Sequence, residues 1–185
     1  MQEEGVFKFY LQYTESEPVA DATIAELNTW RRILWQLELI GQDPERYDGY
    51  GFGNVSQRIG RPDAPAGRRR FVVSGTQTGM LKDLDASHYS IVDSYDAGSN
   101  RVVAEGPVRP SSESLTHGVV CDLEPSVQVV LHVHSPDIWQ QAGALKLPVT
   151  GPAAAYGTPA MAAGGRRLFQ TSGTGRSGIF SMGGH

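Results

Sequence analysis

Hydrophobic residues recur along this chain with two periods, one typical of helices and one typical of strands. From about Ala22 to Leu39 they recur every three or four residues, which predicts a helix capped by Asp21 and ended by Gly41. Two large apolar residues of this segment, Trp30 and Trp35, are expected to pack in the core. The helix is therefore expected to cover one face of a sheet.

Short apolar runs, bounded by turn residues, predict the strands of that sheet. They cover residues 55–59, 70–74, 89–93, 101–103 and 127–135. Further helices are predicted from Ser111 or Ser112 to about Asp122, over 136–144 and over 158–168. Strands and helices mixed in this order favour an α/β domain, a sheet with helices on its faces. No internal repeat or linker divides the sequence, so we expect one domain.

The run from Val127 to Ser135 contains two histidines separated by one residue. Side chains alternate between the faces of a strand, so His132 and His134 should point the same way, about 7 Å apart at Cα. One metal ion can bridge that gap, whereas Val133 should face the packed core. The alternative is an ordinary pair of polar residues on the open face of a sheet, since histidine is tolerated at partly buried positions.

Composition excludes several classes of protein. The formal charge is −4 and the isoelectric point about 5.7, so nucleic acid is not an expected partner. The basic run Arg68–Arg70 is interpreted as a loop leading into a strand. Cys121 is the only cysteine, which rules out an intrachain disulfide and a thiolate zinc site. Without a secretion signal or a membrane-spanning apolar run, we expect a cytoplasmic protein with no membrane partner.

Six short motifs follow one another in a specific order and spacing. They are Gly53-Asn54-Val55-Ser56-x-Arg58, Thr76-Gln77-Thr78-Gly79, Arg109-Pro110-Ser111-Ser112-Glu113, His132-Val133-His134, Tyr156-Gly157-Thr158-Pro159 and Met182-Gly183-Gly184-His185. Together they resemble the class II aldolase/adducin N-terminal domain family, from about residue 22 to the last residue. The resemblance implies a three-layer α/β/α sandwich with a central, largely antiparallel mixed sheet. Because family members continue past the third histidine, it also implies that residues 1–185 form a single domain lacking its C-terminal strand and helix.

The resemblance also implies a site. A divalent metal, zinc first and manganese or cobalt as alternatives, would be held by His132, His134 and His185. Three neutral imidazoles leave coordination positions open for a substrate. Glu113 matches the acid/base residue of the family. A substrate phosphate would be enclosed by the following residues, whose backbone amides and hydroxyls suit an anion: Gly53, Asn54, Thr78, Gly79, Ser111 and Ser112.

The implied function is a metal-dependent lyase or isomerase that acts on a small hydroxy-carbonyl compound, a sugar phosphate, through a metal-stabilised enediolate. The chain has Gly51 where the aldolases have a threonine, and Val149–Pro152 where they have a tyrosine that serves the leaving aldehyde. Gly51 removes one hydroxyl from the implied phosphate pocket. The missing tyrosine favours epimerisation, dehydration or decarboxylation over aldol cleavage. The alternative function is a non-catalytic, adducin-like binding or assembly module. The resemblance implies a homotetramer.

Two further histidines lie outside the metal motif. His88 and His117 are interpreted as surface or hydrogen-bonding residues. His117 follows Glu113 by one helical turn, which makes it a candidate hydrogen-bonding partner of the site.

Overall fold

The computed structural model describes residues 7–152, 158–171 and 178–183. Four residues of the motifs above, Tyr156, Gly157, Gly184 and His185, lie outside these ranges. The elements, in chain order, are β1 Tyr10–Glu15, α1 Asp21–Gln36, β2 Gly41–Gln42, η1 Tyr47–Gly49, β3 Gly51–Phe52, β4 Asn54–Arg58, β5 Phe71–Ser74, η2 Ala86–His88, β6 Tyr89–Asp96, β7 Arg101–Gly106, α2 Ser114–Leu123, β8 Val129–His132, α3 Pro136–Gln140 and α4 Pro159–Thr171.

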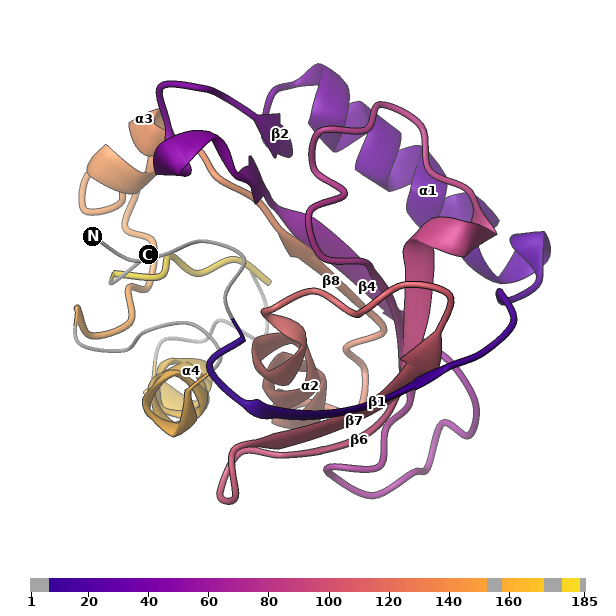
Figure 1. Ribbon diagram of the computed structural model, residues 1–185. Helices are drawn as coiled ribbons and strands as arrows, with labels where there is room; N and C mark the ends of the chain where they lie inside the picture. Colours follow the sequence, from indigo (N-terminus) through magenta and orange to yellow (C-terminus); the bar gives the residue numbers. More distant parts are fainter. Residues whose placement is uncertain (1–6, 153–157, 172–177, 184–185) are drawn as a thin grey trace.

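A six-stranded mixed sheet forms the centre of the molecule, with the strand order β1-β7-β6-β5-β4-β8 (Figure 1). β1 pairs with β7 in parallel, and the other neighbours are antiparallel. Strands β2 and β3 pair separately as a short antiparallel ribbon. The α/β class and the mixed sheet predicted from the sequence are confirmed, although the strand at the β1 edge was missed.

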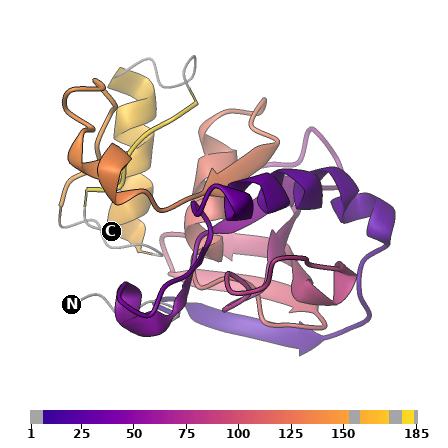
Figure 2. The same cartoon turned by 90° about the horizontal axis from the view of Figure 1, so that it is seen from above.

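Apolar side chains alternate between the two faces of the sheet and make two cores. On one face, Val72 packs with Ile24 and Leu27 of α1. On the other face, Phe71 and Leu115 belong to a second cluster, to which α2 contributes. Figure 1 shows α1 on one side of the sheet and α2 on the other, and Figure 2 shows α4 beside α2, at one end of the sheet. The period-two alternation of β5 therefore supplies both cores at once.

Helix α1 differs at both ends from its prediction. It begins at Asp21, with Ala20 as N-cap and no side-chain cap, so the predicted Asp21 cap is wrong by one residue. It ends at Gln36, because the backbone of Glu38 takes a left-handed conformation (φ 58°). Gly41 belongs to β2, five residues beyond the helix end. An apolar pattern continues past a helix end when the following segment also packs on the core.

The edge strand β8 corrects two burial predictions. Within the described part of the chain, β8 pairs only with β4, so one of its edges has no strand beside it. Val133 is 37% exposed and Trp30 of α1 is 51% exposed, where both were expected in the core. Trp30 lies beside Val129 and Leu131 at this edge. Their exposure follows from the position of β8 at the edge of the sheet, which the sequence pattern alone does not reveal.

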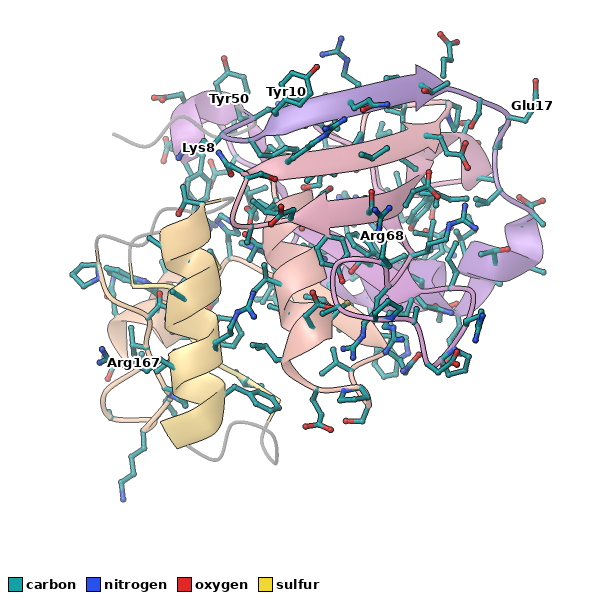
Figure 3. The ribbon with its side chains drawn as sticks, turned by 90° about the horizontal axis from the view of Figure 1, so that it is seen from below. Lys8, Tyr10, Glu17, Tyr50, Arg68 and Arg167 are labelled. Atoms are coloured by element: carbon teal, nitrogen blue, oxygen red, sulfur yellow. The ribbon has the colours of Figure 1, made fainter. Side chains whose placement is uncertain are left out.

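Polar side chains near the β1 edge and in the loop before β5 face solvent. Tyr10 and Glu17 project outward from β1 and the segment after it, and Arg68 lies in the loop before β5 (Figure 3). The neighbouring Arg70 donates to Asp93 at 2.7 Å, which agrees with a structural role for this basic run. Among the residues that the structure describes, no helix has the length and apolar character needed to cross a bilayer.

Candidate functional site

Strand register brings distant segments together at one end of the sheet. The pairing of β4 with β8 places Asn54 directly opposite His132. Next to them, Gly75 forms an isolated antiparallel bridge with Pro110, and the Ser111 N–H donates to the Ser74 carbonyl at 3.1 Å. The start of β4, the turn after β5, the start of α2 and the end of β8 thus meet around one space.

Glu113, His132 and His134 form a cluster of metal-ligating side chains in this place. One ligand atom from each residue lies within 4.8 Å of the others. The two Nε2 atoms of the histidines are 2.9 Å apart, close to the separation of about 3.3 Å that two nitrogen ligands take around a tetrahedral zinc ion. The predicted convergence of His132 and His134 is therefore found, and Glu113 joins them.

Glu113 also determines how His132 presents its ring. Oε2 of Glu113 lies 2.6 Å from Nδ1 of His132, and both side chains are more than nine-tenths buried. When Nδ1–H donates to the carboxylate, the lone pair of the neutral ring is at Nε2, which faces His134. A carboxylate behind a histidine is a common support of metal ligands, so the donor set fits a divalent metal ion.

The α2 helix begins differently from the prediction, and this change positions Glu113. Helical residues start at Ser114, with Glu113 as N-cap rather than in the first turn. The predicted capping serine, Ser111, contributes its Oγ as acceptor for the Glu113 N–H at 3.2 Å. Its carbonyl accepts from the backbone N–H of Ser114 at 3.1 Å. These bonds fix the backbone of Glu113 at the N-terminus of the helix.

An aromatic wall stands beside His134. The ring of Tyr47 meets the imidazole edge-on at 4.7 Å between centroids, and Phe52 lies at 5.4 Å. The guanidinium of Arg46 lies over both aromatic rings, 5.2 and 4.7 Å from their centroids. Tyr47 adopts φ 52°, which is unusual for a bulky residue. Sequence reasoning missed this wall, because it depends on the loop between β2 and β3.

A polar pocket adjoins the cluster and shares Glu113 with it. All six residues predicted to enclose a phosphate line this pocket: Gly53, Asn54, Thr78, Gly79, Ser111 and Ser112. Four further residues complete the lining, Gly51, Gly75, Thr76 and Gln77. Thr76 and Gln77 belong to the second turn motif, and Gly51 and Gly75 stand just before the two motifs, so this proximity in sequence was the available signal. Apart from Glu113, no charged side chain of the described residues lines the pocket.

His117 is completely buried beneath this pocket, which excludes the surface position considered from the sequence. Burial and, to a smaller extent, the neighbouring His132 lower the pKa of His117 to about 3 against the opposing effect of Glu113, so the ring is neutral. An amide oxygen can only accept, so Nε2–H donates to Oδ1 of Asn54 at 2.5 Å. Nδ1 then accepts from the hydroxyl of Ser56 at 2.7 Å.

This arrangement settles the orientation of the Asn54 amide. With Oδ1 held by His117, the Asn54 NH₂ group is directed elsewhere, and within the described residues it makes no hydrogen bond. Asn54 lines the pocket, so these two N–H donors are available to a ligand there. His88, in contrast, takes part in the capping box of η2 with Asp85 and lies outside the site.

An α/β domain whose sheet end carries a Glu/His/His cluster beside an amide-lined pocket fits a metal-assisted enzyme acting on a small molecule, or a relative that kept the fold alone. Residues 43–166 match the family of the class II aldolase and adducin N-terminal domain, and the chain belongs to this family. A search of the curated proteins finds no significant match.

Proposed function

We propose that the protein is a divalent-metal-dependent lyase or isomerase that acts on a small hydroxy-carbonyl compound. One observation carries the proposal: ligand atoms of Glu113, His132 and His134 converge within 4.8 Å at the border of a pocket lined by backbone amides and hydroxyls. Family membership supports a metal-dependent, lyase-like activity. We further propose His185 as the third imidazole ligand, as the resemblance implies, and zinc as the metal, with manganese or cobalt as alternatives.

A divalent ion held by these residues would supply Lewis-acid stabilisation of the negative charge that develops on a carbonyl oxygen of the substrate. Glu113 is proposed to move the proton. Its carboxylate is 3% exposed and lies on the pocket side of the cluster, so it can reach a C–H or O–H group of a bound molecule. The hydrogen bond to His132 Nδ1 couples its protonation to the orientation of that ring.

The proposed substrate carries a phosphate group. Backbone N–H groups near Thr78 and Gly79, the Asn54 amide and the serine hydroxyls supply donors. No cationic side chain lines the pocket in the described part of the chain, which suits a tetrahedral anion held by many weak bonds. The three-layer arrangement, the single domain, the homotetramer and the cytoplasmic location belong to the same proposal. They rest on the family resemblance and, for the layers, on helices α1 and α2 packing against opposite faces.

Elemental analysis of untagged protein tests the metal centre. We expect about one zinc, manganese or cobalt ion per chain in the wild type and none in the double variant His132→Ala/His134→Ala. The matched control is His88→Ala, which removes a histidine of the η2 cap and should keep the metal. No metal in the wild type, even after titration, would contradict the enzyme proposal and favour the adducin-like binding module.

Proton exchange then tests the chemistry without knowledge of the natural substrate. Metal-loaded protein is incubated in D₂O with small hydroxy-ketone and hydroxy-aldehyde phosphates, and loss of the signal of the proton next to the carbonyl is followed by NMR. Exchange that requires Glu113 would support an enediolate-forming enzyme. Metal binding without exchange or turnover on any such compound would contradict catalysis of this class.

A further inference from the structure

Arg31 is a cationic side chain buried on the apolar face of helix α1. It is 1% exposed and lies on the buried face of α1, with Ile24 and Leu27. The sequence carried this signal, because positions 24, 27 and 31 share one helical face. The adjacent Arg32 pairs with Asp83 at 2.5 Å on the surface. Within the described part of the chain, Arg31 makes no ion pair with a carboxylate.

The guanidinium of Arg31 binds backbone carbonyls of the turn that follows β5. Nη2 of Arg31 donates to the carbonyls of Thr78, at 2.9 Å, and Gly79, at 3.3 Å. Nη1 donates to the carbonyl of Lys82 at 2.7 Å. Three carbonyls of one turn are therefore held by a single side chain from a helix on the far side of this turn. Such a planar fork of donors holds its partners in a defined geometry.

These bonds determine where the Gly79 amide points. In a trans peptide, the C=O and the following N–H point in opposite directions, and no cis peptide is present in the described residues. Because the Thr78 carbonyl is turned to Arg31, the Gly79 N–H is turned away from it. Gly79 is buried and lines the pocket, and its N–H has no hydrogen bond within the described residues. A buried amide without a partner calls for a ligand.

Gly51 keeps this amide accessible. A Cβ atom built on Gly51 would lie 3.3 Å from the Gly79 nitrogen, so a side chain at this position would crowd the donor. Gly51, which lacks the hydroxyl of the threonine in the aldolases, thus leaves room for direct contact between a ligand and the Gly79 N–H. Gly51 itself is held by Gln77, whose Oε1 accepts from its N–H at 3.0 Å.

Charge gives Arg31 a second role at the same place. Among the residues that the structure describes, the only charged side chain that lines the pocket is the carboxylate of Glu113, which repels an anion. Arg31 contributes a positive charge directly behind the Thr78 and Gly79 carbonyls, where solvent screens it little. Burial of a cation without a carboxylate is costly, and an anion in the pocket would reduce that cost.

We propose that Arg31 is a positioning residue for an anion, of the phosphate type, in the pocket between the turn after β5 and the start of α2. It orients the Gly79 N–H toward the anion and offsets the charge of Glu113. The inference rests on one part of the proposed function, namely that the substrate carries a phosphate. It does not depend on which reaction the protein catalyses.

Inorganic phosphate is the probe, and its affinity for metal-loaded protein is measured by calorimetry and by ³¹P NMR. We expect Arg31→Met to weaken phosphate binding at least tenfold, and Arg31→Lys, which keeps the charge but not the fork, to fall between Arg31→Met and wild type. The matched control is Arg32→Met, which removes the neighbouring surface arginine and should change affinity less than twofold. Metal content should stay the same in all variants. A folded Arg31→Met protein that binds phosphate as well as wild type would overturn the inference.

The wild type provides a test that does not depend on the folding of a variant. During a phosphate titration followed by NMR, we expect the Gly79 amide and the guanidinium protons of Arg31 to shift together, with the same dissociation constant. Phosphate binding without a shift of the Gly79 amide signal would overturn the inference. Phosphate bound only to the metal would give this result. Metal uptake without phosphate binding would also overturn it while leaving the metal centre intact. Absence of metal would instead contradict the proposed enzyme.

Discussion

Oε2 of Glu113 lies 2.6 Å from Nδ1 of His132, so the N-cap residue of α2 supports the last residue of strand β8. The two residues are 19 positions apart in sequence and belong to different elements, the start of α2 and the end of β8. Their contact joins the candidate acid/base group to a candidate metal ligand. Any change at one of them should therefore affect both metal affinity and proton transfer.

The substitution Glu113→Gln separates these two contributions. The amide keeps the size of the side chain but loses the negative charge and the proton acceptor. We expect metal affinity to fall about 10- to 100-fold, as for other carboxylates that support a histidine ligand. Proton exchange of a hydroxy-carbonyl substrate should fall by about 10²- to 10⁴-fold at saturating metal. Calorimetric metal titration and the D₂O exchange assay measure the two effects. Glu124→Gln, on an exposed glutamate, is the control and should change neither.

His117 should contribute to stability through its two buried hydrogen bonds. His117→Phe leaves Ser56 and Asn54 without their partner, and each unsatisfied buried group costs about 1–3 kcal/mol. Urea unfolding of His117→Phe, Asn54→Ala and the double variant measures the coupling in a double-mutant cycle. A double variant whose loss of stability equals the sum of the single losses would contradict a specific His117–Asn54 interaction.

Gly53 should tolerate substitution less well than another glycine with the same backbone conformation. Gly53 and Gly60 have φ of 76° and 79°. A Cβ on Gly53 would lie 2.7 Å from Cγ1 of Ile40 and 3.2 Å from the carbonyl of His132, whereas a Cβ on Gly60 meets nothing within 4 Å. Gly60→Ala should therefore cost about 1–2 kcal/mol for the left-handed backbone alone.

Gly53→Ala should cost about 1–3 kcal/mol more than Gly60→Ala, because steric overlap is added to the same backbone strain. It should also weaken metal binding, since the overlap displaces the backbone of His132. Thermal unfolding and metal titration of the two variants check this difference. Equal stability losses in the two variants would show that the space around Gly53 relaxes freely.

Cys121 should be inert in the folded protein at neutral pH. Burial raises the pKa of its thiol to about 12, so almost no thiolate forms at pH 8. We expect no reaction with a thiol reagent until the protein unfolds. A rapid reaction in native buffer would contradict the buried position.

The same thiol makes stability depend on alkaline pH. In the unfolded chain the thiol loses its proton near pH 9, and in the folded protein only near pH 12. Its contribution is thus complete below pH 9 and is lost as the pH rises from 9 to about 12. Unfolding free energies of wild type and Cys121→Ala over this range should differ in slope, with the steeper loss in wild type.

Several elements of the site were predictable because they depend on neighbouring residues. His132 and His134 share a direction because side chains alternate along any extended segment. The turn motifs around Gly53 and Thr78 and the serines before Glu113 were recognisable from their order. All of these residues line the cluster or its pocket.

Other features were not predictable, for identifiable reasons. Val133 and Trp30 are exposed because β8 is an edge strand in the described sheet, and edge position depends on the pairing of distant strands. The β1 strand was missed although it pairs with β7, 91 residues away in the register of Tyr10 with Arg101. The wall of Tyr47 and Phe52 beside His134 depends on a loop conformation with positive φ.

By itself, the sequence determined the α/β class, the family and the residue types of a metal centre, because local periodicity and motif order are properties of the chain. Only the tertiary structure decided that Asn54 stands opposite His132, that His117 turns the Asn54 amide, and that Arg31 holds the turn of Thr78 and Gly79. Each of these contacts joins residues more than 45 positions apart. Strand register and helix packing bring them within hydrogen-bonding distance, and no local pattern encodes that distance.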